Sequence, residues 1–370
     1  MVREFYFDKL ILISFFFLII VGVTFVYSAT FTLNDSFYYL KRHLIALSIG
    51  LLLGLLAYIT PIELWKKNAY LLFIFSFVLL IVVLMLPANP DGAKRWINLF
   101  IFNFQPSEFT KFATVTFIAS YISRKSSNFR DSMMPIVFIC TVVFLFAVLP
   151  VAIEPHKGAA LYILMITFLM LLSSKFKSKY ALFPLLVILP FFVVFILKSQ
   201  YAVSRFKGMF DSNPISKEGY QSFQSMLSFA KGGIFGEGIG NGFQKLKYLP
   251  EIHTDYIFAL IGEETGMIGA LGVLLLFMVI FYRGIKVSLE KRDEFTSLIG
   301  LGVTYLITLN AVAHIMVNLN IAPSTGFTLP FVSYGGSSII MNCIYMGVLL
   351  RVSKEPNRIE YIRPSRGLNG

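Results

Sequence analysis

Hydrophobic residues form long continuous runs, separated by short polar segments, along almost the whole chain of 370 residues. Ten such runs lie at about 10–29, 43–60, 69–87, 105–123, 134–153, 158–173, 180–197, 255–282, 295–319 and 330–350. Each is close to the ~20 residues that an α-helix needs to cross ~30 Å of hydrocarbon. A transmembrane β-barrel would show strict alternation over ~10-residue segments instead. The pattern predicts an all-α polytopic membrane protein with ten transmembrane helices.

Composition supports a membrane protein, because hydrophobic residues make up 56% of the chain and charged residues only 14%. A soluble protein cannot bury that much apolar surface. No polar segment is long enough to fold alone, so residues 1–370 are predicted to form a single membrane domain. The longest polar segment, about 198–254, is predicted to be a large loop between helices 7 and 8. Cys140 and Cys343 lie in separate apolar runs and are expected to act as small hydrophobic residues.

The distribution of Lys and Arg predicts the orientation of the chain. The termini and the even-numbered loops hold most of the basic residues of the short segments, among them Lys66, Lys67, Arg124, Lys125, Arg283, Lys286, Lys291, Arg292, Arg351 and Lys354. Cytoplasmic loops are enriched in Lys and Arg, so both termini are predicted to be cytoplasmic and the large loop extracytoplasmic. The net charge of +12 is then explained by topology and by lipid headgroups, without a nucleic-acid partner. The unusual polar sequences all fall on the predicted outer side.

Asp255 begins the eighth run, directly after Thr254 and close to Glu251 and His253. Two interpretations are open. The carboxylate is either an N-cap of the eighth helix, where backbone N–H groups need an acceptor, or a functional group at the water–lipid boundary. There it would act as general base for a sugar hydroxyl or as ligand of a divalent cation.

Glu108 and Lys111 occupy positions i and i+3 of the fourth predicted helix, so their side chains share one face and can pair. They are either a structural ion pair or part of a phosphate site. In the second interpretation Lys111, with Lys94 and Arg95 nearby, binds the oxygens of a lipid pyrophosphate.

Glu263 and Glu264 lie within the eighth run. In a straight helix, Glu263 would be about 12 Å deeper than Asp255. Intramembrane ionisable groups are candidates for function, but we expect these two to be structural. Their predicted partners are polar residues of the ninth helix, such as Asn310, His314 or Asn318.

The large predicted loop contains two distinctive segments. Residues 220–233 have apolar positions at helical spacing, which predicts an amphipathic helix on the membrane surface. Glycines recur between Gly232 and Gly242, and these form either backbone donors for a phosphate or a plain loop. A dinucleotide fingerprint is excluded because no strand precedes them.

Six segments, taken in order, carry a resemblance to a known family: KRWINL, FQPSEFTK, GYQSFQS, GIGNGFQKLKYLPE, HTDYIFALIGEE and TLPFVSYGGSS. With them the chain closely resembles the SEDS family, the cell-wall polymerases of the RodA, FtsW and SpoVE type, over nearly its whole length. The resemblance implies a peptidoglycan glycosyltransferase that polymerises lipid II into growing glycan strands at the outer face of the bacterial cytoplasmic membrane. It also implies a class B penicillin-binding protein as crosslinking partner, and a role in cell division or cell-shape elongation.

The resemblance assigns roles to individual positions. Asp255 matches the essential aspartate of the family, and Glu108 and Lys111 match the acid and the lysine of its QPSE-x-x-K motif. The chain departs from the family where residues 154–158 read Glu-Pro-His-Lys-Gly in place of Pro-Asp-Leu-Gly. The expected aspartate is missing, and Lys157 adds a cation at the predicted outer face.

The implied reaction is an inverting displacement in which a sugar hydroxyl attacks an anomeric carbon and polyprenyl pyrophosphate leaves. Asp255 is predicted to deprotonate the hydroxyl or to position Mg²⁺ or Mn²⁺, and no nucleotide is needed. Lys111, Arg95 and Lys94 are predicted to stabilise the departing pyrophosphate. The predicted supporting residues are Glu108, His253, Glu251, Lys157 and Ser333.

Two alternatives belong to other classes of protein. A lipid II flippase would need polar sites near the midplane that are reachable from both faces, and the one-sided placement of the motifs argues against it. A scaffold that only recruits an enzyme would leave the cost of Glu108, Lys111 and Asp255 near the membrane unexplained.

Overall fold

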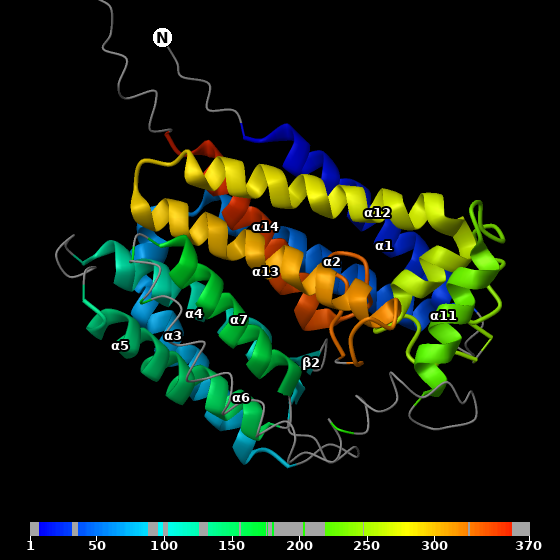
Figure 1. Ribbon diagram of the computed structural model, residues 1–370, viewed down its shortest axis with the longest axis horizontal. Coiled ribbons are helices and arrows are strands. Elements are labelled where there is room, and N and C mark those ends of the chain that lie inside the picture. The colour runs from blue at the N-terminus through cyan, green and yellow to red at the C-terminus, as the bar shows by residue number, and fades with distance from the viewer. Residues whose placement is uncertain are drawn as a thin grey trace, which may run out of the picture.

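The protein is a bundle of helices that lie side by side in the computed structural model (Figure 1). The structure describes residues 7–31, 36–87, 95–98, 103–125, 132–154, 157–174, 176, 180, 203, 219–246, 248–324 and 326–356. The helices are α1 (Lys9–Thr30), α2 (Ser36–Ile59), α3 (Ile62–Met85), α4 (Pro106–Ser123), α5 (Met134–Val143), α6 (Leu149–Ile153), α7 (Lys157–Ser173), α11 (Tyr220–Gly232), α12 (Ile257–Leu289), α13 (Glu294–Asn318) and α14 (Gly336–Lys354). A π-helical turn, Phe144–Val148, joins α5 to α6. Strands β1 (Ile97–Asn98) and β2 (Asn103–Phe104) form a short antiparallel pair.

Among the described residues, seven helical spans are long and apolar enough to cross a membrane, which confirms an all-α multi-pass membrane protein. They coincide with predicted spans one, two, three, five, eight, nine and ten. The fourth and sixth predicted spans are the helices α4 and α7, of 18 and 17 residues. The seventh, 180–197, lies almost wholly outside the described residues. The count of ten therefore stays a prediction.

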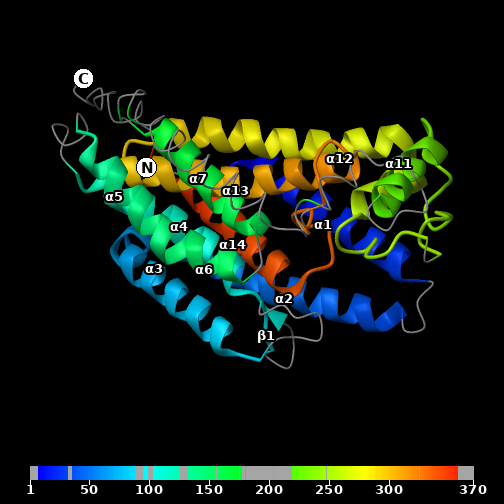
Figure 2. The same cartoon turned by 60° about the horizontal axis from the view of Figure 1, so that its bottom comes forward.

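Exposure shows which helices face lipid. In the most apolar 18-residue stretch of each helix, 28% is buried inside the protein in α3 and in α12, against 78% in α13 and 67% in α14. Figures 1 and 2 accordingly place α13 and α14 in the middle of the bundle, with α12 and α3 at opposite edges. Leu71, Ile74 and Met85 of α3 are more than half exposed, which is stable only in an apolar surrounding.

One end of the bundle is tied together around Asp8. Its Oδ1 atom accepts hydrogen bonds from the N–H groups of Leu10 and Ile11 and so caps α1. Its Oδ2 atom accepts a 2.8 Å bond from Nε of Arg283 in α12. We call this the Asp8 end, and the opposite end, where α11 lies, the α11 end.

The central helices approach closely where glycines face each other. A Cβ atom on Gly347 of α14 would overlap the carbonyl oxygen of Gly54 in α2. Small residues allow this kind of close backbone contact between membrane helices, and α2 and α14 share the most extensive interface among the described helices.

Helix α11 confirms the predicted amphipathic helix. Its polar face, and not its apolar face, packs against the bundle. Ser225 and Ser228 are buried against the bundle, and Ser225 Oγ donates a 2.6 Å hydrogen bond to the carbonyl of Asn318. Phe223 and Met226 point outward, 38% and 52% exposed. An outward apolar face is favourable where it meets lipid, as expected for a helix at the membrane surface.

Helix α12 is broken at Gly266, whose φ of 65° and ψ of −166° are not helical. Segment 233–238 replaces the lost hydrogen bonds. The N–H groups of Glu237 and Gly238 donate to the carbonyls of Glu263 and Glu264, both at 3.0 Å. In return, the N–H groups of Met267 and Ile268 donate to the carbonyls of Gly233 and Ile234. Unpaired backbone groups are costly in a bilayer, so this segment makes the break tolerable.

The break at Gly266 shows that the eighth helix is not straight along its whole length. Asp255 and Glu263 both precede Gly266, so the break does not change the separation expected between these two residues, and the 12 Å estimate stays a prediction.

Candidate functional site

Asp255 lies in a turn directly before α12 and is half-buried. The N-cap of α12 is Tyr256, which makes no side-chain capping bond. Asn318, at the end of α13, caps the helix instead, because its Oδ1 accepts a 2.9 Å bond from the N–H of Ala259. Its Nδ2 group donates a 2.9 Å bond to the backbone carbonyl of Asp255. The interpretation of Asp255 as an N-cap is therefore wrong, and the start of α12 does not depend on its carboxylate.

The segment 326–334, which leads into α14, wraps around this turn. Ser333 Oγ donates a 2.7 Å bond to the carbonyl of Thr254 and accepts a 2.8 Å bond from the N–H of Leu329. The N–H of Tyr334 donates a 2.9 Å bond to the carbonyl of His253. A Cβ atom placed on Gly326 would lie 3.8 Å from Asp255 Oδ2, so the carboxylate faces this segment. We call residues 251–255 the Asp255 turn. Ser333 and His253 thus help to hold this turn in place.

Glu251 is exposed and begins the same turn with a φ of 53°, which is unusual for a residue with a side chain. Its carbonyl accepts a 3.0 Å bond from the N–H of Asp255. Its carboxylate accepts a 3.3 Å bond from the hydroxyl of Thr254. The role of Glu251 visible here is local, as a residue that shapes the turn.

Lys111 and Glu108 form a buried ion pair on α4, with 2.7 Å between Nζ and Oε1. The ammonium group lies 4.9 Å from the centre of the Tyr162 ring. The hydroxyl of Tyr345 donates a 2.9 Å bond to the backbone carbonyl of Glu108. Glu108 Oε2 is buried and has no hydrogen-bond partner among the described residues. Removing either partner would leave an uncompensated buried charge.

Tyr162 connects this ion pair to the Asp255 turn. Its ring packs 5.6 Å from that of Phe327, the residue next to Gly326. His314 Nδ1 lies 2.7 Å from the carbonyl oxygen of Phe327, and Asn310 donates a 3.1 Å bond to the carbonyl of Thr328. Segment 326–328 therefore approaches Asp255 through Gly326 and contacts Tyr162, which adjoins Lys111, through Phe327.

Arg95 belongs to a second polar group, together with Glu154. Its Nε donates a 3.3 Å bond to the backbone carbonyl of Glu154. The Glu154 carboxyl is fully buried, and neither oxygen has a hydrogen-bond partner among the described residues. Burial raises the pKa of Glu154 to about 8, with the nearby Arg95 opposing the rise. Lys157 is half-buried at the start of α7. Lys94, which we predicted to act with Arg95, lies outside the described residues, as do positions 155 and 156.

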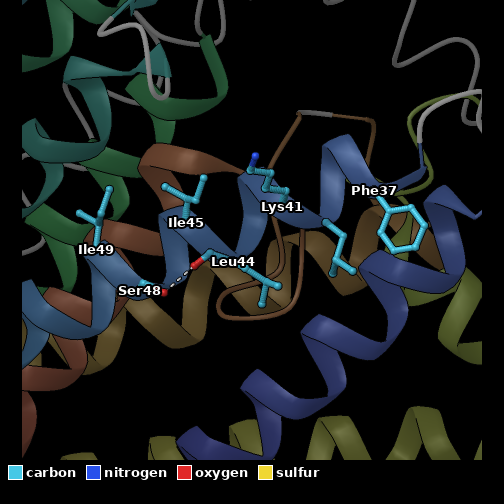
Figure 3. A pocket seen from close by; sticks show the side chains of 7 residues that line it. Phe37, Lys41, Leu44, Ile45, Ser48 and Ile49 are labelled. Atoms are coloured by element: carbon cyan, nitrogen blue, oxygen red, sulfur yellow. Dashed lines mark hydrogen bonds between the residues drawn. The ribbon is translucent and has the colours of Figure 1, made fainter.

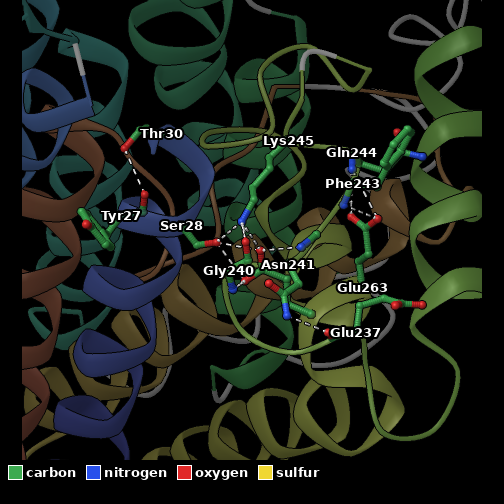
Figure 4. Close-up of polar contacts among 12 residues, drawn as sticks. Tyr27, Ser28, Thr30, Glu237, Gly240, Asn241, Phe243, Gln244, Lys245 and Glu263 are labelled. Carbon is green, nitrogen blue, oxygen red and sulfur yellow. Dashed lines mark hydrogen bonds and ion pairs between the residues drawn. The ribbon is translucent and has the colours of Figure 1, made fainter. Parts of the chain in front are cut away.

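Glu264 accepts bonds from two segments that are distant in the chain. Figure 4 shows that Ser28 of α1 lies close to Gly240 and Lys245 of the large loop. The Glu264 carboxylate accepts bonds from Ser28 Oγ of α1 at 2.7 Å and from the N–H groups of Gly240 and Gly242 at 2.9 and 3.2 Å. It also forms an ion pair with Lys245 at 2.9 Å, in which the two side chains are 0% and 4% exposed.

The neighbouring Glu263 is also fully buried and accepts bonds from the N–H groups of Phe243 and Gln244. The expectation that these acids face Asn310, His314 or Asn318 is wrong. The glycine-rich segment that we considered for a phosphate uses N–H groups to bind carboxylates of its own chain. These contacts favour the structural interpretation of Glu263 and Glu264.

Two sets of polar residues escaped the sequence analysis. Ser28 and Lys245 lie far from Glu264 in the chain, and no local spacing relates them. Tyr39, His43 and Tyr334 gather near His253, and only their residue types, unusual at helix ends in an apolar chain, could have pointed to them.

A divalent cation needs several oxygen, nitrogen or sulfur ligands that converge on one point. Within the described part of the chain, no three His, Cys, Asp or Glu side chains converge. Mg²⁺ is often held by only one or two carboxylates, with water and substrate phosphates as the other ligands. Asp255 alone fits a site of this kind.

An apolar groove of 490 Å³ runs along α2 (Figure 3). It is lined by Phe37, Leu40, Lys41, Leu44, Ile45, Ser48 and Ile49. At 100° per residue these positions lie on the side of α2 opposite Tyr39 and His43. The groove is therefore separate from the Asp255 turn.

Comparison with known proteins identifies the family of this chain. The family model of the FtsW, RodA and SpoVE cell cycle proteins matches residues 8–358. The probable peptidoglycan glycosyltransferase FtsW of Trichlorobacter lovleyi is 35% identical over 342 residues, covering 90% of this chain and 89% of that protein. The protein of the same name from Haemophilus influenzae is 36% identical over 372 residues, covering 97% and 93%.

Solved structures share the fold. One, from work on the structural coordination of polymerization and crosslinking by a peptidoglycan synthase complex, has a TM-score of 0.77 at 24% identity and covers 94% of this chain and 97% of that chain. The rod shape determining protein RodA of Thermus thermophilus has a TM-score of 0.69 at 23% identity, with 94% and 96% covered.

Proposed function

The chain belongs to the FtsW, RodA and SpoVE family and is a peptidoglycan glycosyltransferase, and from this premise we propose that the Asp255 turn is its catalytic centre. The observation that carries the proposal is that residues other than Asp255 cap α12 and hold the Asp255 turn. Asn318 caps the helix and holds the backbone of Asp255, and segment 326–334 holds the turn from the other side. The backbone that carries the carboxylate is thus held by other residues, and the cap of α12 comes from Asn318.

The proposed substrate is lipid II, and the acceptor is one of its sugar hydroxyls. Asp255 takes the proton of that hydroxyl while the oxygen attacks the anomeric carbon of the growing strand. The new glycosidic bond forms as the bond to the polyprenyl pyrophosphate breaks, with inversion at that carbon. A positioned general base contributes about 10²–10⁴ to the rate of such a step.

We assign the stabilisation of the leaving pyrophosphate to Lys111, with Arg95 and Lys94 as further cations. Lys111 is connected to the Asp255 turn through Tyr162 and segment 326–328, and Glu108 holds its ammonium group at 2.7 Å. A preorganised cation is most effective where negative charge develops in a water-poor site. In the alternative to a general base, the Asp255 carboxylate would hold Mg²⁺ or Mn²⁺, which would supply positive charge to stabilise the leaving pyrophosphate.

We further propose ten transmembrane helices, cytoplasmic termini and a catalytic centre that faces outward from the bacterial cytoplasmic membrane. In support, basic residues gather at the Asp8 end: Arg283 pairs with Asp8, Lys66 with Asp293, and Arg351 with Glu355. Cytoplasmic segments are enriched in such residues. The α11 end, with the Asp255 turn, is then the outer end.

We propose a class B penicillin-binding protein as partner and cell division as the setting. The partner is supported by the shared fold with a peptidoglycan synthase complex that coordinates polymerization and crosslinking. The setting is supported by full-length similarity to FtsW proteins.

The test uses purified full-length protein, alone and with its crosslinking partner, given labelled lipid II and Mg²⁺. Wild type should make glycan polymer on a gel, and Asp255→Ala should make none. Glu237→Gln is the matched control, because it removes an exposed carboxylate from the large loop. Polymer from the Asp255 variant would contradict the proposed centre. If wild type with its partner made no polymer, a vesicle assay of lipid II flipping would test the transporter alternative.

A further inference from the structure

Three aromatic rings from separate parts of the chain meet beside the Asp255 turn. Tyr39 comes from the first turns of α2, His253 from the Asp255 turn and Tyr334 from the segment before α14. The ring centres are 5.1 Å apart for Tyr39 and His253, 5.6 Å for Tyr39 and Tyr334, and 5.5 Å for His253 and Tyr334. Each of the three is half-buried, so each presents part of its ring at the surface. We call these three residues the ring cluster.

The ring cluster is fixed to the turn that carries Asp255. His253 lies two residues before Asp255, and its carbonyl accepts the 2.9 Å bond from the N–H of Tyr334. The preceding residue, Ser333, donates to the carbonyl of Thr254 at 2.7 Å. These bonds hold two of the three rings at a constant position relative to the carboxylate. A molecule that rests on the rings is therefore presented to Asp255 in a defined orientation.

Polar groups with unused bonding capacity lie behind the rings. His43, one turn along α2 from Tyr39, is 1% exposed, and its ring centre is 6.2 Å from that of Tyr334. Neither of its ring nitrogens has a hydrogen-bond partner among the described residues. Most buried polar groups in proteins do have one. A neutral imidazole offers one donor and one acceptor, which together match a hydroxyl group.

The cluster therefore combines apolar ring surface with a few polar groups, which is the usual composition of a site for a small organic ligand. A sugar ring has the same two-sided chemistry, with C–H groups on its faces and hydroxyls around its edge. Burial lowers the pKa of His253, although Glu251 opposes the shift. The fold therefore favours the uncharged form of the His253 ring.

We propose that Tyr39, His253 and Tyr334 form the subsite for the acceptor sugar, the sugar whose hydroxyl Asp255 deprotonates. The inference rests on the proposed role of Asp255 and adds to it the residues that orient the attacking sugar. The hydroxyl must lie within hydrogen-bond reach of the base, and fixing the sugar ring beforehand removes much of the entropic barrier to attack. The competing explanation is structural, namely that the rings only fasten the Asp255 turn to α2.

Binding without turnover separates the two explanations. Full-length protein carrying Asp255→Asn is placed in lipid nanodiscs, and its affinity is measured for two ligands. One is the polyprenyl pyrophosphate that bears the disaccharide, and the other is polyprenyl pyrophosphate alone. Adding Tyr39→Leu should weaken binding of the sugar-bearing lipid about tenfold, the effect of losing one aromatic contact, and should change binding of the sugar-free lipid less than twofold.

The matched control is Tyr27→Leu, which removes a tyrosine of α1 that is 39% exposed and packs on Phe31. It should change neither affinity. His253→Leu serves as a second cluster variant if Tyr39→Leu fails to fold. An equal loss for both ligands, or no loss for either, would overturn the sugar subsite and favour the structural explanation.

Steady-state kinetics in the presence of Asp255 give an independent readout. Tyr39→Leu should raise KM for lipid II about tenfold and leave kcat within a factor of two, because the ring binds the sugar without touching the reacting atoms. Failure of the proposed function would be seen separately, as polymer from Asp255→Ala, and would leave the binding experiment interpretable.

Discussion

Carboxylates lie at both ends of the part of α12 that precedes Gly266, and their surroundings differ. Asp255 lies just before this part, and Glu263 and Glu264 lie at its end. Glu263 and Glu264 are fully buried, and their carboxylate oxygens accept bonds from backbone N–H groups, with Ser28 and Lys245 adding to Glu264. Asp255 is half-buried, and its backbone is held by bonds to Asn318 and Glu251. Both sets are ionisable residues at a membrane helix, which sequence reasoning treats alike. The comparison teaches that the surroundings of an acid, more than its presence, distinguish the structural role of Glu263 and Glu264 from the catalytic role proposed for Asp255.

The largest expected effect is on the catalytic side of this comparison. Asp255→Asn should lower the rate of polymerisation by about 10²–10⁴, since it removes the proposed base. Its Tm should stay within about 1 °C of wild type, because Asn318 still caps α12 and such a shift corresponds to under about 1 kcal/mol in a chain of this length. Gel-based polymer assays and thermal unfolding in detergent measure the two quantities. A large loss of Tm would show that Asp255 is structural after all.

Glu264→Gln should behave in the opposite way. It leaves the Lys245 ammonium group buried without its counter-ion, which costs about 3–5 kcal/mol. Thermal unfolding should show a markedly lower Tm, while the molecules that stay folded polymerise at a rate close to wild type. The exposed Glu237→Gln is the control. Adding Lys245→Met should restore part of the lost stability, and a double variant no more stable than the single one would argue against the ion pair.

The Glu108–Lys111 ion pair on α4 combines features of both sets of acids. It is buried, as Glu264 is, and it is proposed to take part in catalysis, as Asp255 is. Lys111→Met and Glu108→Gln should each lower stability, and each should lower polymerisation by about 10²-fold, as losing an electrostatic stabiliser does. The double variant should recover Tm without recovering activity. Recovery of both quantities would identify Glu108 and Lys111 as a purely structural pair.

The smallest effect concerns Glu154, a buried acid whose carboxyl oxygens have no partner among the described residues. Its pKa rises from 4.5 to about 8 on folding because of burial. The folded state therefore holds a proton that the unfolded state releases above pH 4.5, so stability falls as the pH rises towards 8. Glu154→Gln should match wild type near pH 5 and have a Tm a few degrees higher near pH 8.5. A constant difference across this range would contradict the shifted pKa.

The helices were the most predictable part of the molecule. Nine of the ten predicted spans coincide with described helical segments, because a membrane requires each spanning segment to satisfy its own backbone. The Glu108–Lys111 pair was equally accessible, since i and i+3 positions of a helix always share a face. The break at Gly266 was missed, because a glycine within an apolar run is compatible with both a straight and a broken helix.

The sequence by itself determined the class of protein, its family and the three charged residues that the site proposal uses, Asp255, Glu108 and Lys111. Only the tertiary structure decided what surrounds each acid. It assigned the capping of α12 to Asn318, enclosed Glu264 between Ser28 and Lys245, and brought Tyr39 to His253 and Tyr334. The physical reason is the range of the interactions. Apolar runs and helical spacings act between near neighbours in the chain, whereas these contacts join residues that meet only after the helices have packed.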